Sequence, residues 1–183
     1  MEAWSDLYTE IAEQIITKIP EIIWVDLWHE QVSHLSNDLP FQTPAVFISL
    51  YTKECTDRSL LIQDCNMQID MYLFFETFND TYSGAYNQQG AIEFLRLLTK
   101  LHATFHGVNG TNFNTMRRTD MRREESGGSG NLYRISFECM VEDASSQKEY
   151  DQQDVTEISI DKVEDAGKPS TQDEKPLYYV KMS

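Results

Sequence analysis

The chain has 183 residues, with 30 acidic and 15 basic side chains and a formal net charge of -15. This length suits one buried core with an extension and is too short for two ordinary enzyme domains. The acidic charge argues against a protein whose whole surface grips DNA, because neutralising phosphates requires a basic face. No apolar run approaches the roughly 18 residues of a transmembrane helix. The first residues lack the pattern of a secretory signal, so we expect synthesis in the cytosol.

The predicted elements begin with an amphipathic helix. Apolar residues recur every four positions from Leu7 to Ile19, and Pro20 closes the run. A β-branched and aromatic run at 22–28 predicts a short strand. The apolar run at 45–51 predicts a second strand, and its low polar content suits a central position in a sheet.

The clearest alternation in the chain lies between Leu60 and Phe75. Apolar residues from Met67 to Phe75 fall on one face of the predicted strand, and polar residues from Asn66 to Tyr72 fall on the other. We therefore expect a long strand with one core face and one wet or interface-forming face. Helical spacing of apolar residues then predicts a second amphipathic helix from Ala91 to Phe105.

An arginine-rich run at 116–123 is joined to an alternating strand at 132–141 by the Gly/Ser-rich segment 125–131. Two such runs with a turn-forming connector predict a β-hairpin. In the second run the odd-numbered apolar residues are expected to face inward, with Arg134, Ser136 and Glu138 facing out. Together the elements predict an α+β fold: a mixed, mainly antiparallel sheet with two amphipathic helices packed on it.

The composition changes after Asp143. We therefore predict an α+β domain at 1–143 and an acidic C-terminal extension at 144–183, which on its own buries too little surface to order itself. Two apolar islands in the extension, 155–160 and 177–182, alternate like edge strands. They suit addition to a sheet in a partner subunit.

The reactive residue types do not form a recognisable catalytic pattern. Cys55, Cys65 and Cys139 are odd in number and widely spaced, so we expect reduced thiols in or near the core. His102 and His106 have the spacing of two metal ligands on a helix, but the glutamate of the zinc-protease motif is absent. We interpret them as histidines at a helix end whose ring nitrogens have hydrogen-bond partners.

The aspartates of the long strand also have a plain interpretation. Asp57, Asp64 and Asp70 are close in sequence, but spacing alone does not make a nuclease site, and we expect a solvated strand face. The sequence accordingly predicts a protein that is not an enzyme, with no catalytic residues, no cofactor and no metal.

The best functional signal is the group of arginines at Arg117, Arg118, Arg122 and Arg123, which reverses the sign of charge in an acidic chain. Acidic neighbours at 120, 124 and 125 weaken an interpretation as a nucleic-acid surface. Arginine forms forked pairs with carboxylates, and every copy of this protein offers an acidic surface, so we favour contacts between subunits. A solvated strand face is the alternative.

The order of elements carries one resemblance. In chain order, the parts are the first helix, the strand entered through Thr43-Pro44-Ala45-Val46-Phe47-Ile48, the long alternating strand, the helix Ala91–Phe105, and a closing hairpin that ends in Phe137-Glu138-Cys139-Met140-Val141-Glu142-Asp143. This order resembles that of the tail-terminator and tail-completion proteins of tailed bacteriophages, and of the related neck proteins between portal and tail. The resemblance spans Leu7 to Asp143.

The resemblance implies a structural protein of the virion, made in the host cytoplasm. It implies a homo-oligomeric ring that joins the portal or connector to tail proteins, with DNA passing through the bore without specific binding. In such a ring the hairpin and the long strand make lateral contacts. A mobile loop faces the channel or the next ring; its residues here are Glu124, Glu125, Gly127, Gly128 and Gly130. The acidic excess suits a lumen that repels phosphate over about 10 Å at moderate salt.

The C-terminal extension departs from the minimal family pattern, and we interpret it as a clamp on an adjacent protein that folds on assembly. A second function class stays open: a small non-enzymatic adaptor or inhibitor of a host protein. It predicts a monomer whose extension orders only with its partner.

Overall fold

The computed structural model describes residues 3–32, 40–76, 80–127 and 130–147, and the short strands at 159–162 and 178–181. The chain divides into two compact units, Met1–Lys148 and Glu149–Ser183. The predicted boundary at residue 143 coincides with the last residue of a strand of the first unit.

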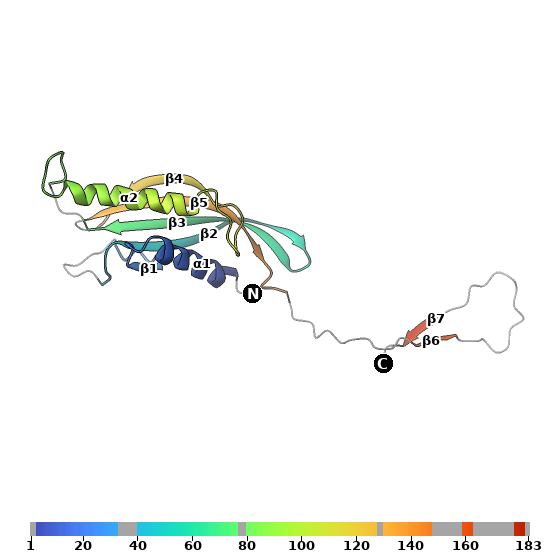
Figure 1. Ribbon diagram of the computed structural model, residues 1–183. Coiled ribbons are helices and arrows are strands. Elements are labelled where there is room, and N and C mark those ends of the chain that lie inside the picture. The colour runs from blue at the N-terminus through green and yellow to red at the C-terminus, as the bar shows by residue number, and fades with distance from the viewer. Residues whose placement is uncertain are drawn as a thin grey trace, which may run out of the picture. The chain divides into compact units, whose positions relative to one another are not determined.

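The first unit is built on a five-stranded sheet with the order β1-β2-β3-β5-β4 (Figure 1). The strands are β1 (Trp24–Leu27), β2 (Ala45–Ser59), β3 (Ile62–Phe75), β4 (Arg117–Glu124) and β5 (Asn131–Asp143). β1 runs parallel to β2, and the other neighbours are antiparallel. The predicted α+β fold with a mixed, mainly antiparallel sheet is therefore confirmed. The central place belongs to β3, with β2 beside it.

Both helices of the first unit, α1 (Ala3–Lys18) and α2 (Gln88–Phe105), contribute to the apolar core on one face of the sheet. α1 buries the predicted stripe, and Leu7, Ile11 and Ile15 are inaccessible to solvent. The apolar side of β3, from Met67 to Leu73, lies in the same core. The apolar residues spaced four apart in α1 and those spaced two apart in β3 thus pack together in one apolar layer.

A second, smaller core lies on the opposite side of the sheet, at the start of β2. Its fully buried rings are Phe47 and Phe74, and Phe41 lies edge-on to both, with ring centroids 4.9 and 5.7 Å away. Trp28, just after β1, stacks on Tyr72 with centroids 4.1 Å apart and planes 8° apart. The segments after β1 and before β2 therefore cover one end of this side of the sheet.

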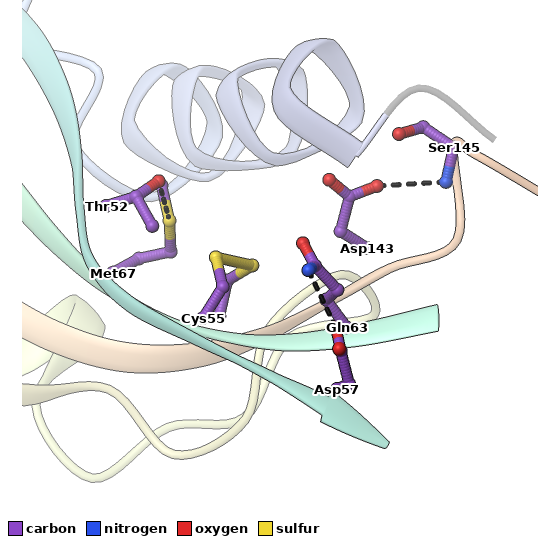
Figure 2. Close-up of a disulfide and its surroundings, with 8 residues drawn as sticks. Thr52, Cys55, Asp57, Gln63, Met67, Asp143 and Ser145 are labelled. Atoms are coloured by element: carbon purple, nitrogen blue, oxygen red, sulfur yellow. Dashed lines mark hydrogen bonds between the residues drawn. A yellow bond between two sulfur atoms is a disulfide. The ribbon is translucent and has the colours of Figure 1, made fainter. Parts of the chain in front are cut away.

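The β2–β3 hairpin is longer than the sequence pattern predicts. β2 continues to Ser59, and this end of the hairpin extends past both helices in Figure 1. Cys55 and Cys65 are paired across the two strands, with Cα atoms 4.1 Å apart, and form a disulfide (Figure 2). The expectation that these cysteines are reduced is therefore wrong. The reason is register: antiparallel pairing places the two residues directly opposite each other. Cys139 is free and buried, as expected.

In the second unit, β6 (Ser159–Lys162) and β7 (Tyr178–Lys181) form an antiparallel two-stranded sheet. They overlap the two predicted apolar islands, whose remaining residues lie outside the described part of the chain. The islands are therefore paired with each other. Addition to a partner's sheet stays a prediction.

Removing the disulfide with Cys55→Ala and Cys65→Ala should destabilise the fold. We expect the free energy of unfolding to fall by about 2–3 kcal/mol, because the cross-link, between cysteines 10 positions apart, restricts the unfolded chain. Urea unfolding followed by circular dichroism measures the difference. Dithiothreitol should lower the stability of the wild type and leave the variant unchanged; equal stability of the oxidised wild type and the variant would contradict a structural role.

Candidate functional site

We call the side of the sheet opposite the helices the open face. Beyond its small apolar end it carries rows of polar and charged residues, because the registers of four strands place them side by side. Each row contains one residue of β5 and the residue of β3 paired with it: Arg134 with Tyr72, Ser136 with Asp70, and Glu138 with Gln68. The predicted outward direction of Arg134, Ser136 and Glu138 is thus confirmed. This face is not fully solvated, however, since Ser136 is only 3% exposed and Asp70 only 8% exposed.

Arg134 is the centre of the charge cluster on the open face. Its Nη1 donates to Asp70 Oδ2 at 3.3 Å. Its Nε lies 2.9 Å from Glu124 Oε1, although this N–H is not aligned for a hydrogen bond, and its Nη2 lies 3.8 Å from Asp120. The side chains of Arg134 and Asp70 are 14% and 11% exposed. The interpretation of Asp70 as a solvated strand residue is therefore wrong: it is half of a largely buried ion pair.

The cluster changes the titration of its aromatic neighbour. Burial, followed by the charges of Asp70 and Glu124, raises the pKa of Tyr72 to about 12. The indole of Trp28 covers the Tyr72 ring. The phenol is therefore neutral at physiological pH and acts as a packing group.

The four arginines of the predicted contact all lie on β4 and are all exposed, but they divide between two faces. Arg117 pairs with Glu138 and Arg122 with Arg134, which places both on the open face. Arg118 and Arg123 pair with Phe137 and Tyr133, on the side of the helices. Arg122 also lies 3.1 Å from Glu124 and 3.6 Å from Asp120. β4 is therefore a charged edge strand with cations on both sides, and not a single cationic face.

The turn between β4 and β5 contains the predicted channel loop. Glu124 ends β4 and is an ion partner of Arg122 and Arg134, whereas Glu125 is exposed. The backbone N–H of Gly127 donates to the carbonyl of Val32 at 3.0 Å, so this part of the turn is anchored to the body. Gly128 lies outside the described residues.

Gly130 is the place where this turn needs glycine. Its φ is 156°, and a Cβ there would lie 2.6 Å from the ring of Phe74. A side chain at this position would collide with the small apolar core.

Strand β4 forms one edge of the sheet. Within the described residues, β5 is the one strand that pairs with β4, so the outer edge of β4 has main-chain donors and acceptors without a strand partner. A register shift between Arg118 and Asp120 marks a bulge in this strand. Charged side chains and a bulge on an edge strand limit indiscriminate pairing with other strands.

The two histidines at the end of α2 lie together, with ring centroids 4.7 Å apart. Nδ1 of His106 accepts the backbone N–H of Arg118 at 3.1 Å, so this histidine is satisfied as expected. Nδ1 of His102 is buried without a hydrogen-bond partner, which differs from the expectation. Burial, followed by the charges of Arg118 and His106, lowers the pKa of His102.

Three further observations concern chemistry and membranes. In the described residues, no three His, Cys, Asp or Glu side chains group in a way that would hold a metal ion. Burial raises the pKa of the Cys139 thiol to about 12, so it is a neutral core group at physiological pH. Neither described helix combines the length and apolarity that a membrane crossing needs.

A comparison with protein-family models finds no match, and neither does a comparison with curated proteins.

Replacing Arg134 with methionine should destabilise the fold by about 3 kcal/mol, because Asp70 is left largely buried without its cation. Urea unfolding at neutral pH measures the loss. The double variant Arg134→Met with Asp70→Asn should recover part of it, since no unpaired charge remains. As the control, Arg123→Met on the same hairpin should change stability by less than about 0.5 kcal/mol. Equal effects of the two single variants would contradict the buried-pair interpretation.

The lowered pKa of His102 predicts a loss of stability in mild acid. Its folded-state pKa lies below its unfolded value of about 6.5, so the contribution of neutral His102 is complete above that value. It is lost as the pH falls through the folded-state pKa. We expect His102→Gln to flatten the fall in unfolding free energy below pH 6.5. His29→Gln, in an exposed loop, is the control, and an unchanged slope in His102→Gln would refute the assignment.

Proposed function

We propose that this protein is a structural virion protein of a tailed bacteriophage, of the tail-terminator or tail-completion type. It forms a homo-oligomeric ring at the interface between neck and tail, where it joins the portal or connector to the tail. The ring surrounds the DNA channel, and DNA passes through it without specific binding. The protein performs no catalysis.

The observation that supports this proposal is the position and charge of β4. It is a strand at the edge of the sheet, it bears four of the chain's arginines, and seven of its eight residues are exposed. The chain as a whole has a formal net charge of -15. A cationic edge on an acidic protein suits another acidic copy, because forked arginine–carboxylate pairs and main-chain hydrogen bonds can form together.

The two edges of the sheet also support a ring. β4 has eight residues and is cationic, whereas β1 at the other edge has four residues and carries Asp26. Contacts between unlike edges are heterologous, and heterologous contacts generate closed rings when the rotation between copies closes.

The charge pattern of the open face suits a DNA conduit. Several of its cations have carboxylate partners: Arg134 has Asp70, Lys53 has Glu138, and Arg58 has Asp64 and Glu142. Cations already paired in this way have little to offer a phosphate backbone, since phosphate affinity depends on free basic side chains.

Solution mass measurement with negative-stain imaging tests the proposal. We expect rings with a central passage and a mass that is a whole multiple of the chain mass. A strictly monomeric protein at high concentration would contradict the ring and favour the adaptor or inhibitor function.

The arginines of β4 provide the matching variant. We expect Arg117→Gln, Arg118→Gln, Arg122→Gln and Arg123→Gln together to impair assembly and leave the monomer folded, because all four side chains are exposed. Mass photometry measures assembly and circular dichroism the fold. Lys18→Gln, at the end of α1, is the control. Rings of the quadruple variant at the normal yield would refute the bridging role.

A further inference from the structure

The C-terminal end of α2 is joined to the start of β4 by a side chain. Nδ1 of His106 accepts the backbone N–H of Arg118 at 3.1 Å, so a main-chain donor of this edge strand is bonded to an imidazole. An imidazole nitrogen accepts a hydrogen bond only while it carries no proton of its own. The contact therefore requires a neutral His106 with its proton on Nε2.

A second imidazole lies against the first. The ring centroids of His102 and His106 are 4.7 Å apart, and Nδ1 of His102 is buried without a hydrogen-bond partner. Burial, followed by the charges of Arg118 and His106, lowers the pKa of His102. A proton on either ring places a positive charge close to the other ring and to the arginine, and like charges at such distances repel.

The strands packed against the two rings present no carboxylate to them in the described part of the chain. On the helix side of β4 the charged residues are Arg118 and Arg123, whereas Asp120 lies on the open face. The residues of β5 that face the helices beside them, Ile135 and Phe137, are apolar and inaccessible to solvent. The sheet therefore has no counter-ion for a protonated histidine at this place.

The surroundings of the rings are completed by the loop 107–116 and by the rest of α2. The loop contains no titratable side chain. The carboxylate of Glu10 approaches it from α1, where it accepts the backbone N–H groups of two loop residues. On α2, Lys100 lies on the flank that faces Glu21 and pairs with it there. Neither carboxylate is bonded to an imidazole.

We propose that His102 and His106 form a pH-sensitive latch on the edge strand β4. When His106 takes a proton from solvent, its Nδ1 becomes a donor that faces another donor, and the hydrogen bond to Arg118 is lost. The start of β4 then separates from the end of α2, and the Arg118 N–H becomes available to a carbonyl oxygen of an added strand. The latch belongs to a single chain and does not depend on the formation of a ring.

The release is confined to a short segment. Met116, just before β4, is inaccessible to solvent, and main-chain hydrogen bonds hold it to the residues that follow α2. After Arg118, the register shift before Asp120 interrupts the regular pairing with β5. Residues 117–119 can therefore move while the rest of the strand stays in place.

Amide hydrogen exchange of the full chain, read by mass spectrometry at single residues, tests the latch. Each rate is converted to a protection factor, which removes the intrinsic pH dependence of exchange. From about pH 8 to about pH 5.5, we expect the protection of the Arg118 amide to fall about tenfold. The amides of β5 should lose much less, which separates local release from global unfolding. Constant protection at Arg118, or an equal loss along β5, would overturn the proposal.

Two variants at residue 106 isolate the acceptor. His106→Asn keeps a side-chain oxygen near the place of Nδ1 and cannot titrate, so the protection of the Arg118 amide should be the same at both pH values. His106→Ala removes the acceptor, so protection should be low at both. His29→Asn, in an exposed loop, is the control and should behave like the wild type. A loss in His106→Asn as large as in the wild type, or full protection in His106→Ala, would also overturn the latch.

Discussion

The register of β3 is the constraint on which the first unit depends. This strand is paired on both sides along nearly its whole length, with β2 and with β5. A slip of one residue would turn Met67 to Leu73 away from the helices and carry Asp70 into the apolar core. The same register places Tyr72 beside Arg134. One pairing therefore fixes both the apolar layer under the helices and the charge cluster on the open face.

The parts of the fold that the sequence predicts are those with a strong apolar period. The helices and the alternating part of β3 belong to this class. The second half of β2 does not, since Thr52 to Ser59 is mostly polar and its extended form depends on pairing with β3. The disulfide depends on the same pairing, because cysteine spacing alone does not show which residues lie opposite. Likewise, the partner of Asp70 is distant in sequence, and only the sheet brings Arg134 beside it.

The distribution of the arginines of β4 between the two faces of the sheet does not follow from simple alternation, because of one inserted residue. Strict alternation along β4 would place Arg117 and Arg123 on one face and Arg118 and Arg122 on the other. The register shift at Thr119 inserts one residue and exchanges the faces of the first pair. Arg117 thereby joins Arg122 on the open face. The cationic strand can be recognised from its sequence, but the division of its charge between two surfaces depends on a bulge that no residue type marks.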